Sequence, residues 1–262
     1  MKVNKPLRLA WYGNPKIGKS HLAAQFVKDF DGIYMDFARV NIISAPKVKN
    51  GPKSEYTVKT GMMNTGDAYT AAENVGLNPS QYQYVESWDQ FEMLVDYAIN
   101  YRDNISKKPN KRIWVVIDDT TNFRYQALQK VLQKTDHESP SRPDWTMTNM
   151  VLVSMFNRLE RNFNSIYVNQ RKEEYVRDEP TGNYVGEFYP KNLEFIVDAT
   201  IFYTEGVDEL DIKYPKFEVK SLRNKWRFST DDSYKKVLEF KDVKTLQPST
   251  ILEALHIEKD MW

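Results

Sequence analysis

The chain alternates short apolar runs with stretches of helical periodicity, and this pattern predicts an α/β protein. Leu7–Tyr12 is the first apolar run, and apolar residues then recur at steps of three and four at Leu22, Ala23, Phe26, Val27 and Phe30. That spacing places their side chains on one face of a helix. Further runs short enough for strands are Ile33–Phe37, Gln81–Val85, Ile113–Ile117, Ser165–Asn169, Asp198–Thr204 and Lys216–Ser221. The alternation predicts a mostly parallel central sheet flanked by helices, with the last strands as an antiparallel edge.

Later helices are predicted from caps and periodicity. One helix is expected to begin near Ser87 and a second directly after Asp119. A third is expected to span about Thr148–Asn162, and a fourth to lie within Pro248–Glu258. Ser87 is a suitable N-cap because Gln90 occupies the capping-box position. The polar stretch 134–145 is expected to be a loop. We expect one α/β domain over residues 1–228, with residues 229–262 forming a helical tail packed on it.

A phosphate-binding motif joins the first strand to the first helix. The segment GNPKIGKS fits the pattern G-x-x-x-x-G-K-[ST], in which loop amides cradle phosphate oxygens at a helix N-terminus. Lys19 is expected to reach the β- and γ-phosphates, and the Ser20 hydroxyl to bind Mg²⁺. A chance glycine-rich turn is the alternative, and the flanking strand and helix argue against it. The candidate nucleotide-binding residues are Gly13, Asn14, Pro15, Lys16, Ile17, Gly18, Lys19, Ser20 and His21.

Two carboxylates follow the apolar run Ile113–Ile117. In P-loop proteins such a strand delivers its first aspartate to Mg²⁺, so we assign Asp118 to the metal. Asp119 has two open interpretations, because it can orient or deprotonate the attacking water or can cap the next helix. Gln170 follows the neighbouring strand and is the candidate sensor of the γ-phosphate, which makes Lys19, Asp119 and Gln170 the candidate catalytic residues.

Basic and aromatic residues interleave after Gln170. We predict a hairpin of 172–177 and 183–189 around a type I turn at Glu179-Pro180-Thr181-Gly182. Aromatic rings can stack on bases while cations follow phosphates, although an ordinary amphipathic hairpin has the same pattern. The candidate DNA-binding residues are Arg142, Arg171, Lys172, Tyr175, Arg177 and Tyr184. Arg223 and Lys225 have two interpretations. In an oligomer they could contact the phosphates bound by a neighbouring subunit, or they could be solvent-exposed charges on an edge strand of the sheet.

Composition narrows the classes of function. The net charge is +1, so contact with nucleic acid requires a local basic patch. The absence of cysteine excludes disulfides, thiol catalysis and cysteine-ligated zinc. The three histidines, His21, His137 and His256, are far apart and make no metal-spaced pair. The sequence has no signal-like start and no apolar run of about 18 residues, so we expect a cytoplasmic protein with no membrane partner.

The segments GNPKIGKS, IWVVIDD, SIYVNQRKEEY and DATIFYTE resemble, in order and spacing, the phage-type RecA-like P-loop ATPases. This AAA group includes Sak-type single-strand annealing proteins, and the resemblance covers roughly residues 5–228. It implies a RecA-like core that binds ATP and Mg²⁺, forms homo-oligomers and handles single-stranded DNA in recombination. It also implies a host bacterial cytoplasm, a single-strand-binding protein as partner, and DNA-contacting loops at 134–145 and 172–189.

One position departs from that group. Its members often carry Asp-Thr-Glu after the second strand, where the Glu activates water, whereas this chain has Asp36-Phe37-Ala38. Either Asp119 takes over that work or hydrolysis is slow. The leading hypothesis is an ATP-dependent recombination protein acting on single-stranded DNA. Its rivals are a nucleotide-gated assembly or loader protein that does not contact DNA and, last, a small-molecule phosphotransferase.

Overall fold

In the computed structural model of the protein, the described residues are 6–14, 18–37, 77, 81–104, 112–176, 178–187, 193–207, 213–222, 237–239 and 247–255. Their strands are β1 (Arg8–Gly13), β2 (Gly32–Asp36), β3 (Tyr82–Tyr84), β4 (Trp114–Asp118), β5 (Asn164–Val168), β6 (Arg171–Val176), β7 (Glu179–Gly186), β8 (Ala199–Val207), β9 (Lys213–Leu222) and β10 (Val237–Glu239). Their helices are α1 (Lys19–Phe30), α5 (Trp88–Asn104), α6 (Thr120–Thr135), α7 (Arg142–Asn162), α8 (Leu193–Ile196) and α9 (Pro248–Ala254).

A single large sheet forms the centre of the molecule, in the order β10-β9-β8-β1-β5-β4-β2-β3. The strands from β8 to β3 in this order are parallel, whereas β9 and β10 pair antiparallel at one edge. The predicted fold class, a mostly parallel α/β sheet with an antiparallel C-terminal edge, is therefore confirmed. The segment 229–262, expected to be a helical tail packed on the domain, also contains strand β10, which joins the central sheet beside β9.

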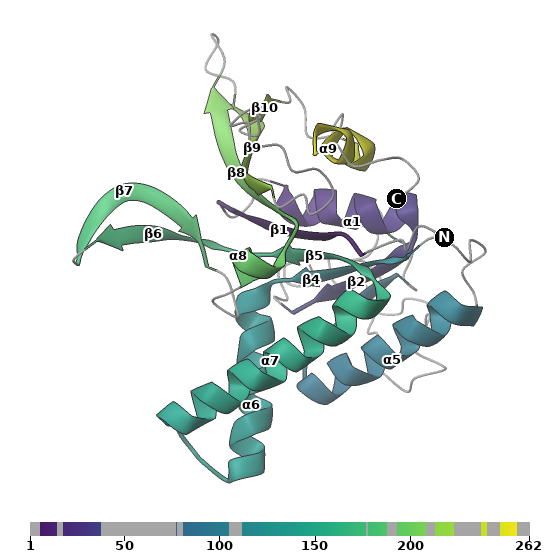
Figure 1. The fold of residues 1–262 in the computed structure, drawn as a ribbon, viewed down its shortest axis with the longest axis vertical. Helices are drawn as coiled ribbons and strands as arrows, with labels where there is room; N and C mark the ends of the chain where they lie inside the picture. Colours follow the sequence, from purple (N-terminus) through teal and green to yellow (C-terminus); the bar gives the residue numbers. More distant parts are fainter. Residues whose placement is uncertain are drawn as a thin grey trace, which may run out of the picture.

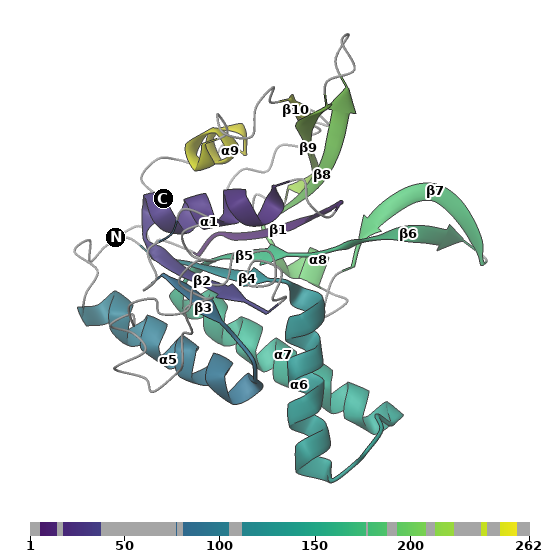
Figure 2. The same cartoon turned by 180° about the vertical axis from the view of Figure 1, so that it is seen from behind.

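Helices cover both faces of this sheet (Figures 1 and 2). Side chains of one face, such as Trp11 and Trp114, pack with α1 and α9. Side chains of the other face, such as Val115 and Ile117, pack with α5, α6 and α7. Because the central strands are buried on both sides, they appear in the sequence as continuous apolar runs instead of alternating ones.

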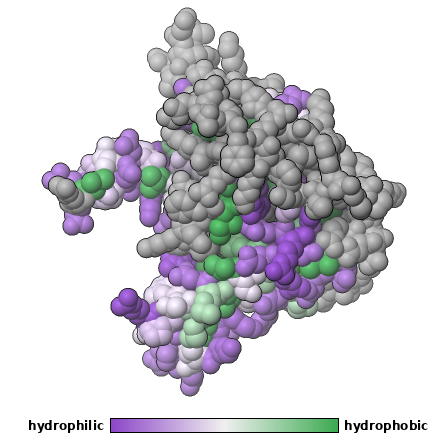
Figure 3. All heavy atoms as spheres, viewed as in Figure 1, coloured by the Kyte–Doolittle hydropathy of each residue, from purple (hydrophilic) through white to green (hydrophobic). Residues whose placement is uncertain are grey.

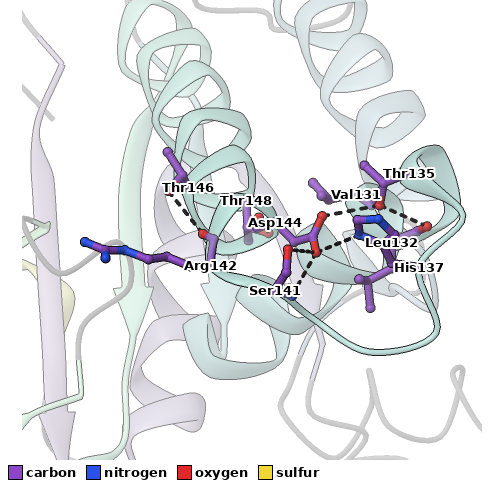
Figure 4. Close-up of polar contacts among 9 residues, drawn as sticks. All are labelled: Val131, Leu132, Thr135, His137, Ser141, Arg142, Asp144, Thr146 and Thr148. Carbon is purple, nitrogen blue, oxygen red and sulfur yellow. Dashed lines mark hydrogen bonds and ion pairs between the residues drawn. The ribbon is translucent and has the colours of Figure 1, made fainter.

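The two central helices α6 and α7 extend well beyond the sheet and end in a short connection (Figure 1). Helix α6 ends at Thr135 and helix α7 begins at Arg142, so the expected loop 134–145 is a loop only over 136–141, and its two ends are helical. The start is fixed by Asp144, whose carboxylate accepts hydrogen bonds from the Ser141 N–H at 2.8 Å and the Ser141 hydroxyl. His137 contacts the same oxygen at 2.9 Å, and the Thr135 hydroxyl donates to the other oxygen at 3.3 Å (Figure 4).

Strands β6 and β7 form a separate two-stranded sheet that projects from the body (Figures 1 and 2). Val176 pairs with Glu179, so the predicted turn at 179–182 is wrong and these residues belong to β7. Asp178 has a φ of 65°, which provides the tight reversal instead. The register of the pairing shifts between Glu173 and Tyr175.

Candidate nucleotide-binding site

The sheet brings the ends of three strands together. Strand β5 lies between β1 and β4, with Val168 paired in register with both Trp11 and Asp118. The P-loop follows β1, Asp118 ends β4 and Gln170 follows β5. Because these strands are parallel, all three segments lie at the same edge of the sheet, where ligands of open α/β sheets bind.

Glycine is required at the end of β1. Gly13 has a φ of 149°, and a Cβ atom there would lie 2.1 Å from the carbonyl oxygen of Tyr203 on β8. Gly18 takes the left-handed conformation, with a φ of 90°, directly before α1. The backbone at both ends of the P-loop therefore has the form that the motif predicted. Pro15, Lys16 and Ile17 lie outside the described residues.

The Lys19 side chain folds back over the loop that precedes it. Its ammonium group donates to the carbonyl oxygens of Gly13 at 3.1 Å and of Asn14 at 2.5 Å, and the residue is 8% exposed. Burial lowers the pKa of Lys19 to about 8, with Asp118 and Asp119 opposing the shift and the positive charge of Arg171 adding to it. A buried cation with only carbonyl partners is well suited to bind phosphate.

Ser20 and Asp118 form the candidate metal site. The Ser20 hydroxyl lies close enough to the Asp118 carboxylate to lower the pKa of Asp118, so the two predicted ligands are brought together. Burial raises the pKa of Asp118, and the hydrogen bonds from Ser20 and from the Tyr34 hydroxyl oppose that shift. Hydroxyl and carboxylate oxygens are the ligands that Mg²⁺ prefers beside nucleotide phosphates. These residues therefore fit a Mg²⁺–nucleotide complex.

Two buried tyrosine–aspartate pairs support this metal site. The Tyr34 hydroxyl donates to Asp118, and the Tyr82 hydroxyl donates to Asp36, the strand neighbour of Asp118. The two tyrosine rings are stacked with their centroids 5.5 Å apart. These pairs leave no signal in the sequence, because both tyrosines occupy ordinary buried positions of strands and their partners are distant in the chain.

Asp119 makes two separate contacts. Its Oδ1 accepts from the backbone N–H of Asn122 at 2.8 Å, which caps α6. Its Oδ2 accepts from the Gln170 amide at 3.0 Å, so the two candidate catalytic side chains are in direct contact. One carboxylate oxygen of Asp119 therefore caps helix α6, while the other accepts a hydrogen bond from Gln170, which follows the neighbouring strand β5.

A buried amide fixes the spacing of the strand ends. The Asn169 side chain donates to the carbonyl oxygens of Trp11 at 3.1 Å and Tyr167 at 2.8 Å, and it accepts from the Thr120 hydroxyl. These contacts tie β1, β5 and α6 together directly beside Gln170. A polar residue after a buried strand was the available sequence signal, but only Gln170 was assigned from it.

The remaining candidates are dispersed. His21 lies on α1, with its Nε2 atom 3.2 Å from the Gln25 amide nitrogen. Arg142 lies at the far end of the α6–α7 pair, whereas Arg171, Lys172, Tyr175 and Tyr184 belong to the β6–β7 hairpin, and the two elements project in different directions (Figure 1). The candidates outside the described residues are Ala38, Arg177, Arg223 and Lys225.

This strand order, with a P-loop between β1 and α1 and carboxylates at the strand ends, defines a P-loop nucleotide-binding domain. The sequence profile of the AAA domain family matches residues 5–242, and the chain belongs to this family. It is therefore an ATP-binding domain of the AAA type. No helix in the described part of the chain has the length and apolar character needed to cross a membrane.

Solved structures give a weaker likeness. The chain is similar to a prototypical ATPase from the type III secretion system of pathogenic bacteria, with 15% identity and a TM-score of 0.43. It is also similar to the ATP synthase subunit NeqB from Nanoarcheaum equitans, with 14% identity and a TM-score of 0.41. Both alignments cover 76% of this chain, which spans 52% and 46% of the two structures. No curated protein sequence matches the chain.

Proposed function

We propose that the protein is a Mg²⁺-dependent ATPase. The observation that carries this proposal is the contact between Asp119 and Gln170, made beside the Ser20–Asp118 pair at one edge of the sheet. Lys19 would hold the β- and γ-phosphates, and Ser20 and Asp118 would hold the metal, which supplies positive charge to the phosphates when bound. The Oδ2 atom of Asp119 would accept a hydrogen bond from the attacking water, and Gln170 would hold that carboxylate in position.

Hydrolysis in this proposal is slow. Ala38 occupies the position at which the resembling group carries a water-activating Glu, so Asp119 is left to do this work while it also caps α6. A carboxylate that keeps one oxygen in a helix cap has less freedom to follow the reacting water. ATP binding is therefore the primary property, and turnover depends on an effector.

The proposed effector is single-stranded DNA, which the protein would handle as a recombination protein in oligomeric form. Exposed aromatic rings support this choice: Tyr175 is 60% exposed and Tyr184 is 41% exposed on the projecting hairpin. Apolar and polar surface alternate along that hairpin (Figure 3). Bases of any sequence can stack on such rings.

A second candidate is a nucleotide-gated assembly protein that makes no contact with DNA. The charge of the hairpin favours it, because residues 171–187 contain five carboxylates against three cations. A net negative hairpin repels phosphate backbones and suits a basic protein partner. An isolated two-stranded sheet is marginally stable in water, so a docked partner of either kind would stabilise it.

ATP hydrolysis with and without a single-stranded oligonucleotide separates the two, with Lys19→Ala as the control. Stimulation that disappears in the control and weakens steeply with salt supports the DNA-coupled ATPase. An ATP hydrolysis rate that does not change when DNA is added, together with an oligomer size that changes with ATP, supports the assembly protein. ATP binding that survives Lys19→Ala would overturn both.

A further inference from the structure

The hairpin begins immediately beside the nucleotide site. Arg171 is the first residue of β6 and directly follows Gln170, whose side chain contacts Asp119. The carbonyl oxygen of Gln170 also accepts from the N–H of Glu187, at the other foot of the hairpin, at 2.8 Å. The root of the hairpin is thus held at the same sheet edge as the P-loop.

Arg171 is held in an unusual way for a half-buried cation. Its guanidinium lies over the ring of Tyr184, 3.6 Å from the ring centroid. Although the hairpin is rich in carboxylates, Arg171 makes no ion pair with any residue in the described part of the chain. Its partner across the strands is Gly186, which has no side chain. Stacking fixes the plane of the guanidinium, and its N–H donors, which lie in that plane, have no acceptor among the described residues.

The surroundings indicate an anion as the missing partner. Among the described residues, Lys19 has only carbonyl oxygens as hydrogen-bond partners. Lys19 and Arg171 lie at the same edge of the sheet, and like charges gathered at one edge are electrostatically costly without an anion between them. A phosphate removes that cost, and a planar guanidinium can bind two of its oxygens at once.

We propose that Arg171, held flat on Tyr184, binds the terminal phosphate of the nucleoside triphosphate from within the same chain. This inference rests on the proposed nucleotide site and adds a residue that distinguishes triphosphate from diphosphate. Lys19 would bind both nucleotides, whereas Arg171 lies beside Gln170, the candidate sensor of the third phosphate. Arg171 is thereby reassigned from the DNA-binding candidates, and Tyr184 becomes its positioning residue.

The test compares the affinities of the full-length chain for Mg²⁺–ADP and for a non-hydrolysable Mg²⁺–ATP analogue, measured by calorimetry. Arg171→Gln should weaken the triphosphate about ten- to hundredfold, the effect of one charge-assisted hydrogen bond, and leave ADP within about twofold. Lys172→Gln, the adjacent exposed cation on the same strand, should change neither affinity. Tyr184→Leu should reproduce part of the Arg171→Gln effect, whereas Tyr184→Phe, which keeps the ring, should not.

Equal losses for both nucleotides in Arg171→Gln, or no loss for either, would overturn the inference. The same holds if Arg171→Gln reduces only oligonucleotide binding, because the arginine would then be a DNA contact. If Arg171→Gln fails to fold, the affinities of Tyr184→Leu and Tyr184→Phe for the two nucleotides test the same contact. Only the leucine variant removes the ring on which Arg171 stacks. A failure of the nucleotide site itself is distinguishable, because the unmodified chain would then bind neither nucleotide, or Lys19→Ala would leave the affinity for both unchanged.

Discussion

The hydroxyl of Tyr34 on β2 donates a hydrogen bond to the carboxylate of Asp118 on β4. Asp118 also lies close to Ser20, so the tyrosine holds one candidate metal ligand beside the other. The contact also offsets part of the effect of burial, which raises the pKa of Asp118 and thus favours the form that cannot bind metal.

Tyr34→Phe should therefore weaken Mg²⁺ binding at the nucleotide site. We expect the Mg²⁺ concentration for half-maximal binding of a triphosphate analogue to rise about tenfold, the lower end of the usual effect of losing such a supporting contact. Tyr203→Phe is the matched control, because the buried Tyr203 hydroxyl has no hydrogen-bond partner among the described residues. An unchanged Mg²⁺ requirement in Tyr34→Phe would show that Asp118 is oriented without the tyrosine.

Lys19 gives the nucleotide site a pH dependence. Its pKa is lowered to about 8 by burial in the protein without ligand, whereas phosphate contact favours the charged form. The contribution of Lys19 to ATP affinity should be constant below about pH 8 and should fall as the pH rises above it, with uptake of a proton on binding. Calorimetry in buffers of different ionisation enthalpy measures this uptake. Lys19→Met should bind weakly and without that pH dependence, and a flat profile in the unmodified chain would contradict the prediction.

The two roles of Asp119 can be separated by Asp119→Asn. Asparagine is as good an N-cap as aspartate, so the helix start should keep its stability to within a few tenths of a kcal/mol. An amide is a poor base, so hydrolysis should fall by about a hundredfold or more while ATP affinity is retained. Gln170→Ala should also slow hydrolysis, by a smaller factor, because the Asp119 carboxylate survives. Normal turnover in Asp119→Asn would leave capping as the only role of this residue.

The connection between α6 and α7 should be sensitive to acid. Hydrogen bonds from the Ser141 side chain and backbone and the contact with His137 hold the pKa of Asp144 well below its usual range. A lowered pKa in the folded state contributes stability that is present above the ordinary carboxyl pKa of about 4 and is lost as the pH falls further.

Asp144→Asn should accordingly lower the midpoint of thermal unfolding at pH 7. It should also show a smaller further drop in that midpoint below about pH 4 than the unmodified chain. Asp136→Asn changes an exposed carboxylate in the same connection and serves as the control. Thermal unfolding followed by circular dichroism at both pH values measures the difference. Equal acid sensitivity in the two variants would mean that the network at Asp144 contributes nothing specific.

Local sequence was sufficient to predict the elements that place the site. The P-loop, the strand that ends in Asp118 and the position of Gln170 all follow from short runs with fixed neighbours, and parallel pairing then brings them to one edge. The start of α7 was missed although Ser141, Pro143 and Asp144 form a helix-start signal, because the surrounding segment is uniformly polar and was interpreted as a loop.

Pairings between distant residues were not predictable in the same way. Tyr34 and Asp118 are 84 positions apart, and Tyr82 and Asp36 are 46 apart, so no spacing rule links them. The turn of the hairpin was misplaced for a different reason. Glu179-Pro180-Thr181-Gly182 suits a type I turn, but strand pairing selects the reversal at Asp178.

Strand β6 begins directly after Gln170, so the β6–β7 hairpin is connected to the nucleotide site without a linker. Strand β6 is six residues long, which corresponds to about 20 Å of lever arm. Because Gln170 and Arg171 lie at its root, any rotation at the root displaces the far end of the hairpin by the largest distance. Under the proposed contact of Arg171 with the third phosphate, the position of the hairpin would depend on whether tri- or diphosphate is bound, and a partner could detect that difference.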